Sequence, residues 1–451
     1  MSDDDAVAAA VAAVADRVHP TDAERRRLDA AVDDLLERTR AAVSDLPVEA
    51  DVLQVGSTAR GTWIRGDRDI DVFVRFPPDL DRERLERYGL QVGRAVLQDG
   101  EEEYAEHPYV TGEYAGFDVD LVPCYRVDSA SDIRSAVDRT PFHTTYVADR
   151  LDADGAAEVR LLKQFLVGIG AYGSDLRTRG FSGYLTELLV LAYGSFRDVL
   201  AAAADWRPPV ELDPADHAAE TFDDPLVVVD PTDPGRNVAA VVSEANVARL
   251  THYARTFLAD PSPEAFVPDP PDPLDPAEVR EHLSRRGTAP LAIRFDAPDL
   301  VDDQLYPQLR RSLDGLRRGL EGAGFEVLRA TTVAADAAVL FVECATGELP
   351  AVERHVGPPV ATRSHATGFY ETYADAAVYG PFLDGDRYVV ERERSVRTVE
   401  EFARERLLEV ALGAHVEDAL REGYGVLVGD EVATLADAFG VELARYFDPT
   451  P

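Results

Sequence analysis

Lysine, cysteine and long apolar runs are scarce in this sequence of 451 residues. The two cysteines, Cys124 and Cys344, stand far apart without a partner at metal-binding spacing, so neither a disulfide framework nor a zinc site is indicated. No apolar run approaches the length of a membrane span, and the acidic first residues differ from a signal or transit peptide. We therefore expect a cytoplasmic protein of two to four domains, with two buried thiols and no membrane partner.

Basic residues are also few, and 45 of the 46 are arginine, Lys163 being the single lysine. With 84 acidic residues the formal net charge is −38, which normally argues against nucleic acid, because affinity for phosphates needs cationic patches. This composition resembles proteins of salt-in haloarchaea, whose acidic surfaces keep them soluble at high ionic strength. Net charge then reflects the solvent, and local arginine clusters would have to carry any contact with nucleic acid.

Carboxylates alternate with apolar side chains in the stretch 69–76, D-I-D-V-F-V-R-F, on which the interpretation of the whole chain depends. A strand points alternate side chains to opposite faces, so Asp69 and Asp71 share one face with Cα atoms about 6.6 Å apart. Two carboxylates at that spacing can converge on one divalent ion or on a pair of ions. The alternative is a solvated strand face, which is plausible in so acidic a chain.

A Gly-Ser corner precedes this strand. A short apolar strand at 52–55 breaks at Gly56 and Ser57, and a turn or short helix containing Arg60 is expected to follow. Backbone N–H groups, a hydroxyl and a guanidinium gathered at one corner suit an anionic ligand, since unpaired amides and arginine both favour phosphate oxygens. Together with the nearby D-x-D pattern, the corner favours a site over a solvated surface.

A second alternating strand is predicted at 117–125, with Asp118 and Asp120 on one face. A third carboxylate from a neighbouring strand would complete an oxygen ligand set for hard cations. Asp120 is the better candidate because apolar residues follow it directly, and an exposed edge strand is the alternative for Asp118. Helices expected at 21–43 and 80–97, the first with a capping box, would cover the sheet.

The middle of the chain holds the single lysine within an apolar helical segment. Its retention indicates a site that needs a compact ammonium rather than a planar guanidinium, with chance retention as the alternative. His143 lies between two expected helices, where a lone histidine is more often structural. A buried strand at 226–230 leads into a Pro-rich loop that presents Arg236 and Asn237 before a helix expected at 238–258, and a capping loop with a solvent-facing arginine is the alternative.

Taken together, 54–76 and 117–125 resemble the catalytic palm of the nucleotidyltransferase superfamily, in which G-S precedes D-x-D and a distant third Asp. Five further segments resemble archaeal, class I, CCA-adding enzymes. This resemblance extends from the helix expected at 21–43 to about residue 260. These segments are 139–143, 160–163, 172–173, 179–184 and 230–238.

The resemblance implies template-independent addition of C, C and A to tRNA 3′ ends from CTP and ATP. The reaction would be an in-line attack of the RNA 3′-hydroxyl on the α-phosphate, with two Mg²⁺ ions as cofactors and release of pyrophosphate. Catalysis and metal binding would fall to Asp69, Asp71 and Asp120. Nucleotide binding would fall to Gly56, Ser57, Arg60, His143, Lys163, Tyr172 and Arg236, the last of these reading the base.

Proline marks the clearest boundary, at 261–275, where helix and strand potential are both low. We expect an α+β multidomain protein. Its parts would be a nucleotidyltransferase palm with a mixed sheet at 1–130, a helical middle domain at 131–260, the linker, and an α+β, ferredoxin- or RRM-like C-terminal body and tail at 276–451. The last part is predicted to contain a strand at 388–390 and helices near 399–420 and 431–446.

An expected helix at 306–321 carries four arginines outside its apolar stripe. This face is a candidate for contact with the tRNA backbone, and a solvated face with Asp314 and Glu321 as partners is the alternative. The arginines are Arg310, Arg311, Arg317 and Arg318.

Other functions and assemblies stay open at the level of sequence. The alternative enzymes are a poly(A) polymerase or an oligoadenylate-type synthetase, and the alternative of another class is an inactive RNA-binding relative. Retention of three carboxylates argues against the inactive relative, since a cluster of like charges is costly. A homodimer is one assembly compatible with the sequence.

Overall fold

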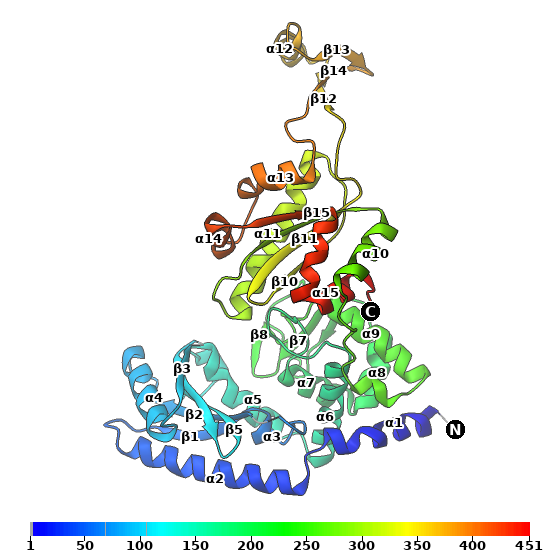
Figure 1. Cartoon of the computed structure of the whole chain (residues 1–451). Helices are drawn as coiled ribbons and strands as arrows, with labels where there is room; N and C mark the ends of the chain where they lie inside the picture. Colours follow the sequence, from blue (N-terminus) through cyan, green and yellow to red (C-terminus); the bar gives the residue numbers. More distant parts are fainter. Residues whose placement is uncertain (1–2, 68, 105) are drawn as a thin grey trace. The chain divides into compact units, whose positions relative to one another are not determined.

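The computed structural model describes residues 3–67, 69–104 and 106–451 (Figure 1). The chain divides into two compact units, the first ending at Asp269 and the second spanning Pro270–Thr450. Among the described residues, no helix has the length and apolar character that crossing a bilayer requires. The boundary falls within the Pro-rich segment, but part of this segment is packed rather than extended, because Phe266 of η3 (Pro263–Phe266) is buried in the core of the first unit.

A mixed sheet of order β1-β2-β5-β4-β3 forms the first part of the first unit. β2 and β5 pair in parallel, and the other neighbours pair antiparallel. The alternation predicted for 69–76 is confirmed, since Ile70 and Val72 enter one core while Phe73 enters another. The strands are β1 (Asp51–Val55), β2 (Asp69–Phe76), β3 (Glu101–Tyr104), β4 (Pro108–Tyr114) and β5 (Phe117–Tyr125).

Two helices cover one face of this sheet (Figure 1). α2 (Asp22–Ser44) begins at the predicted capping box, in which Thr21 and Glu24 each accept a backbone N–H of the other. α4 (Arg82–Val96) contributes Leu85 and Val92 to the same core. The opposite face of the sheet has a smaller apolar cluster, so polar side chains near the ends of the strands can lie on that face.

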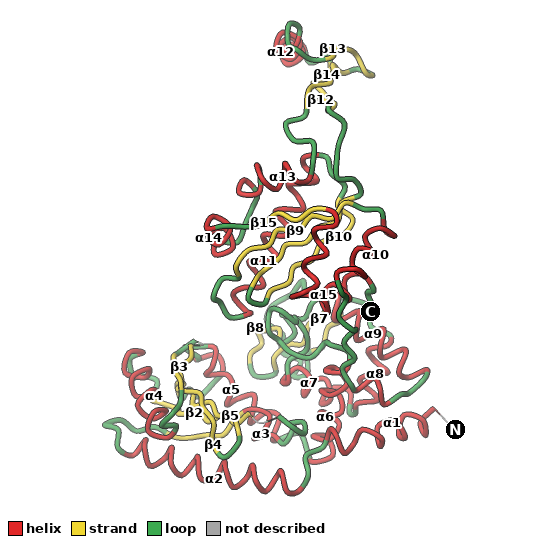
Figure 2. Tube along the Cα trace, viewed as in Figure 1, coloured by secondary structure: helices red, strands yellow, loops and turns green. Residues whose placement is uncertain are grey.

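Helices dominate the rest of the first unit, as Figure 2 shows. Their shared core includes the buried side of α1 (Asp3–Val18), a helix that the sequence patterns did not predict. The apolar stretch 181–200 forms two helices, because the chain breaks at Gly194 and Ser195. The remaining helices here are α5 (Thr140–Ala148), α6 (Ala153–Gly168), α7 (Gly183–Tyr193), α8 (Phe196–Ala204) and α9 (Glu244–Ala259).

The segment around Arg236 is a strand rather than the predicted loop. β7 (Leu226–Asp230) is fully buried and pairs with β8 (Asp233–Asn237) on one side and β6 (Val210–Leu212) on the other. The side chain of Asn237 accepts the backbone N–H groups of Val228 and Ala239, which holds the following turn. The predicted helix 238–258 therefore starts later, at Glu244, where Ser243 caps it.

The second unit contains an antiparallel sheet of order β10-β11-β9-β15. With α11 between β9 and β10, and α13 and α14 before β15, this is the split βαβ arrangement of ferredoxin-like folds, so the predicted α+β fold is confirmed. The elements are β9 (Ala289–Asp296), α11 (Asp302–Ala323), β10 (Val327–Ala334), β11 (Ala337–Cys344), α13 (Val399–Glu405), α14 (Ala414–Glu422) and β15 (Gly425–Val428).

Additional elements surround this sheet. α10 (Pro276–Arg286) and α15 (Ala436–Phe447) pack on its second face. A separate sheet of β12 (Val352–Pro359), β14 (Arg387–Glu393) and β13 (Tyr379–Asp384) is accompanied by α12 (Arg363–Tyr373), and only its β14 was predicted. The single helix predicted at 399–420 is wrong, because η4 (Leu407–Glu409) and an irregular segment separate α13 from α14.

Candidate active site

Aspartates occupy matching positions on the two parallel strands of the first sheet. Asp71 of β2 pairs in register with Asp120 of β5, and Asp69 pairs with Asp118. Asp69 and Asp118 are exposed at the strand ends, whereas Asp71 and Asp120 are partly buried. Because a parallel pair keeps the register of both strands, Asp69, Asp71 and Asp120 lie on one face at neighbouring positions.

Gly56 brings the Gly-Ser corner against these carboxylates. It begins the short helix α3 (Gly56–Arg60) with a φ of +77°, a conformation that favours glycine. A Cβ at this position would lie only 1.9 Å from Oδ2 of Asp71. Both the backbone conformation and the close approach thus require glycine, and the two motifs found 13 residues apart in the sequence meet in space.

The electrostatics of these aspartates fit a bound cation. Burial, and then the charges of Asp120 and Asp69, raise the pKa of Asp71 to about 6. Burial also raises the pKa of Asp120. Carboxylates whose ionisation is disfavoured in this way gain from a nearby positive charge, and carboxylate oxygens are the ligands that Mg²⁺ prefers. Within the described part of the chain, no group of three His, Cys, Asp or Glu side chains forms a preassembled metal site.

Arg60 is held by a buried carboxylate of the helical part. Its Nε donates to Glu187 at 2.9 Å and one terminal nitrogen donates to Oγ1 of Thr144 at 3.2 Å. Glu187, on α7, is fully buried and also accepts the hydroxyl of Thr62. The guanidinium of Arg60 is therefore fixed between α3, α5 and α7, and a residue 127 positions away determines its orientation.

The single lysine lies in the same network. Lys163 is 2% exposed, and its Nζ donates to Oγ1 of Thr62 at 3.5 Å. Burial lowers the pKa of this ammonium, while the charge of Glu187 opposes the change. Glycine at the start of α7 leaves room for it, since a Cβ on Gly183 would lie 3.2 Å from the hydroxyl of Tyr172 and 3.4 Å from Nζ of Lys163. The Nζ of Lys163 and the hydroxyl of Tyr172 thus both lie beside Gly183.

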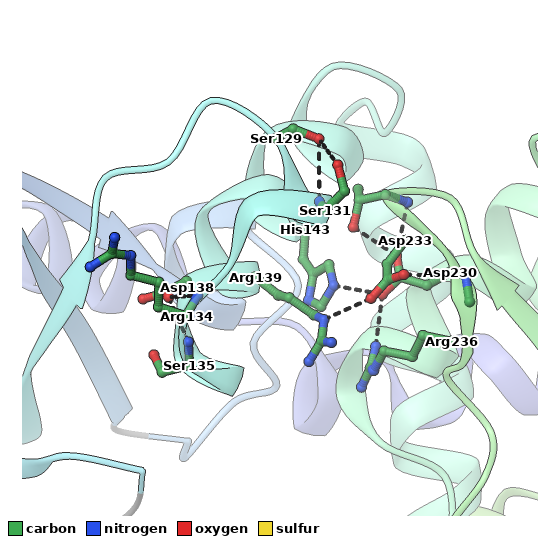
Figure 3. A network of polar contacts seen from close by, with 12 residues as sticks. Ser129, Ser131, Arg134, Ser135, Asp138, Arg139, His143, Asp230, Asp233 and Arg236 are labelled. Atoms are coloured by element: carbon green, nitrogen blue, oxygen red, sulfur yellow. Dashed lines mark hydrogen bonds and ion pairs between the residues drawn. The ribbon is translucent and has the colours of Figure 1, made fainter. Parts of the chain in front are cut away.

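A second buried carboxylate, Asp230 at the end of β7, joins His143 to Arg236. Nε2 of His143 and one terminal nitrogen of Arg236 each lie 2.8 Å from Oδ2 of Asp230 (Figure 3). His143 stacks on Tyr184 with ring centroids 4.0 Å apart. Burial lowers the pKa of His143, although the hydrogen bond to Asp230 opposes that change.

The structure groups the predicted residues of the first unit into three sets. Gly56 lies against Asp71, Arg60 shares a network with Lys163, and His143 shares one with Arg236.

The predicted arginines of α11 belong to the second unit. There Arg317 forms ion pairs with Asp314 at 3.5 Å and with Glu321 at 3.3 Å, as expected for the alternative of a solvated face.

Sequence reasoning did not identify Glu187 and Asp230 as site residues. Each carried a signal, because Glu187 interrupts an apolar helix and Asp230 ends a run of four apolar residues. A charged residue fully buried in such a run needs a partner. The sequence alone does not show that both partners are arginines of the predicted site.

Three family models match successive parts of the chain. They are described as "Nucleotidyltransferase domain" at residues 36–143, "tRNA nucleotidyltransferase, second domain" at 157–267 and "CCA-adding enzyme, C-terminal domain" at 286–429. The first two contain every predicted catalytic and nucleotide-binding residue.

Curated relatives match over nearly the whole length. A CCA-adding enzyme of Haloarcula marismortui is 60% identical over 469 residues, covering 100% of both chains. One of Halobacterium salinarum strain R1 is 64% identical over 98% of this chain and 99% of the relative. One of Methanosarcina acetivorans is 41% identical over 94% and 95%. The resemblance found in the motifs is confirmed, and the chain belongs to the CCA-adding enzyme family, a family of tRNA nucleotidyltransferases.

Proposed function

We propose that CCA addition takes place at the aspartates of β2 and β5, with nucleotide groups held by the adjoining helices. The observation that carries this proposal is the close approach of Gly56 to Asp71, which joins the Gly-Ser corner to the carboxylates. The raised pKa of Asp71 supports it, because an uncompensated pair of carboxylates is expected where a cation binds.

Asp69, Asp71 and Asp120 would hold two Mg²⁺ ions. When bound, the ions supply activation of the RNA 3′-hydroxyl and neutralisation of charge on the phosphates. The protein's own part is to keep three carboxylates at fixed positions on rigid strands. Mg²⁺ commonly keeps waters and substrate phosphates among its ligands, so a few carboxylates suffice.

The triphosphate would bind at Gly56, Ser57, Arg60, Lys163 and Tyr172. Arg60 has five N–H donors, of which Nε and one terminal nitrogen are directed to Glu187 and Thr144, so further donors are available for phosphate oxygens. Lys163 adds a second cation 3.5 Å from the hydroxyl of Thr62, in the same network. Fixed cations of this kind bind and orient the triphosphate for in-line attack at the α-phosphate.

His143 and Arg236 would face the base of the incoming nucleotide. They come from different elements, α5 and β8, and meet at one carboxylate. In the absence of a nucleic-acid template, protein donors and acceptors at fixed positions have to distinguish CTP and ATP from other nucleotides.

The remaining assignments are also proposals. We keep the division into a head at 1–130, a helical domain at 131–260, a linker at 261–275 and a C-terminal body and tail at 276–451, although α1 packs with the helical part. We propose that the arginines of α11 contact the tRNA backbone, that the enzyme acts in the cytoplasm, and that a homodimer is its assembly.

A stepwise extension assay tests the proposed reaction. The protein is incubated in high KCl with Mg²⁺, labelled CTP or ATP, and tRNA transcripts lacking one, two or three terminal nucleotides. Addition that stops after CCA is expected, with Asp120→Asn inactive on all three transcripts. Long A tails would instead indicate a poly(A) polymerase, and an active Asp120→Asn variant would contradict the assignment of the carboxylates.

A further inference from the structure

Asp230 is the most heavily hydrogen-bonded carboxylate among the described residues around the site. It is fully buried, and Oδ2 lies 2.8 Å from both His143 Nε2 and an Arg236 terminal nitrogen. Oδ1 accepts the backbone N–H and hydroxyl of Thr232 at 2.9 and 2.8 Å and the hydroxyl of Tyr184 at 3.3 Å. Although burial opposes ionisation, the hydrogen bond from His143 and the other donors lower the pKa of this carboxyl.

An ionised carboxylate fixes the proton of His143. Such a carboxylate only accepts hydrogen bonds, so Nε2 of His143 must carry the hydrogen. The lowered pKa of His143 keeps the ring neutral at pH 7, which leaves Nδ1 as an acceptor. Stacking on Tyr184, at an angle of 16° between the rings, fixes the ring plane. Both the tautomer and the orientation of His143 therefore depend on groups around Asp230.

The same oxygen restrains Arg236. Its side chain is 36% exposed, so one end of the guanidinium is held by a buried carboxylate while part of the side chain remains accessible. A guanidinium is planar, and one fixed N–H bond restricts the directions of its other donors. Figure 3 shows His143 and Arg236 approaching Asp230 from different elements.

We propose that Asp230 is a positioning residue for base selection. By accepting hydrogen bonds from His143 and Arg236 together, it holds both groups in the geometry that favours cytosine and adenine over uracil and guanine. This inference rests on the proposed function, in which His143 and Arg236 face the base.

Hydrogen-bond chemistry explains why orientation matters for this selection. Cytosine and adenine both carry a bare ring nitrogen beside their amino group, whereas uracil and guanine carry an N–H beside a carbonyl oxygen. A guanidinium donor held at that ring position favours the first pair and opposes the second. Polar sites that leave a group unpaired with the wrong substrate discriminate strongly, but only while their donors stay fixed.

Asp230→Asn is the principal variant, because it keeps the size of the side chain and removes its charge. The amide would direct a donor at groups that are themselves donors, so His143 can change tautomer and Arg236 is released. The assay measures kcat/KM for CTP, UTP, ATP and GTP on tRNA transcripts of the appropriate length in high KCl. We expect the preference for CTP over UTP and for ATP over GTP to fall by about tenfold or more, with tRNA affinity unchanged.

Asp233→Asn is the matched control. Asp233 belongs to the same hairpin and also accepts from an arginine, Arg139, at 3.0 Å. The Asp233→Asn variant should leave the preference for CTP over UTP and the preference for ATP over GTP within about twofold of wild type. An equal loss of kcat/KM for all four nucleotides in Asp230→Asn would show a structural role only and overturn the inference.

Two further variants keep the test decisive. Arg236→Ala tests the proposed function itself. If this variant retains full base preference, the assignment of Arg236 to the base fails. If Arg236→Ala loses base preference but a folded Asp230→Asn variant does not, only the inference about Asp230 is rejected. If melting shows that Asp230→Asn does not fold, Tyr184→Phe replaces it, since it keeps the ring on His143 and removes one donor to Asp230. A folded Tyr184→Phe should lose about two- to threefold in preference, and wild-type preference there would overturn the inference.

Discussion

Two arginine–carboxylate pairs, one from each unit, differ in burial and in what holds the arginine. In the first unit, the side chain of Arg60 is 7% exposed and its partner Glu187 is 0% exposed. On α11 of the second unit, Arg317 is 42% exposed and its partner Asp314 is 54% exposed. Both are arginine–carboxylate pairs in an acidic chain, yet only the first is isolated from water.

The difference in burial predicts a difference in how much each pair contributes to stability. A buried pair that loses one partner leaves an uncompensated charge, whereas an exposed pair contributes little and is screened by salt. Arginine content alone therefore says little about function in this chain. Burial of the partner carboxylate is what distinguishes the two pairs.

Asp71→Asn should have the largest effect on activity. Removing a carboxylate from the proposed metal site should lower kcat/KM for CTP by about a thousandfold or more, while tRNA affinity remains close to wild type. The measurement is labelled CTP incorporation together with filter binding of tRNA. Turnover within tenfold of wild type would contradict a metal site at β2.

Glu187→Gln tests the buried side of the comparison. It leaves the guanidinium of Arg60 without its counter-charge, so we expect a loss of about 3–5 kcal/mol in the free energy of unfolding, measured by urea in high KCl. The KM for CTP should rise as well, because Arg60 and Lys163 lose their shared neighbour.

Asp314→Asn on α11 is the matched exposed change and should cost less than about 0.5 kcal/mol. Equal losses of unfolding free energy in Glu187→Gln and Asp314→Asn would remove the distinction between the two regions.

Lowering the pH is expected to reduce kcat/KM less than Asp71→Asn does. Because the pKa of Asp71 is raised to about 6, this carboxyl takes up a proton as the pH falls through that value and competes with a cation. At subsaturating Mg²⁺, kcat/KM should fall by up to about tenfold per pH unit below pH 6. An unchanged rate between pH 5 and 7 would contradict the role of Asp71.

Arg317→Ala combined with Arg318→Ala should affect stability as little as Asp314→Asn does. Both side chains are well exposed, so the unfolding free energy should change by about 0.5 kcal/mol or less. If they contact tRNA phosphates, tRNA affinity should fall and the slope of log Kd against log salt should decrease by about one to two. Unchanged affinity would leave α11 as a solvated face.

Local patterns were sufficient for the elements that bear the chemistry. Alternation predicted β2 and β5, and helical spacing predicted α2 and α11, because each has one clearly apolar face. α1 lacks such a contrast, since alanine fills seven of its 16 positions, and β3 begins with three exposed glutamates. Those elements are defined by their tertiary or sheet partners, which single-sequence periodicity does not contain.

The candidate site was predictable only in part for a related reason. Asp71 and Arg60 belong to local motifs, and the register of parallel strands brings Asp120 beside Asp71. Contacts across long separations, such as Thr62 with Glu187 or His143 with Asp230, depend on how helices pack. The sequence indicated the groups that we propose face the substrate, but not the buried carboxylates to which they are hydrogen-bonded.

The thermal stability of wild type and Asp71→Asn, with and without Mg²⁺, tests the central claim most directly. A folded-state pKa of about 6 means that ionised Asp71 destabilises the protein above that pH, by about 3 kcal/mol relative to an unperturbed aspartate. At pH 7.5 in high KCl with CTP but no divalent ion, Asp71→Asn should melt at a higher temperature than wild type, and Mg²⁺ should raise the melting temperature of wild type but hardly that of the variant. Equal shifts with Mg²⁺ in both proteins would contradict a cation site at these carboxylates.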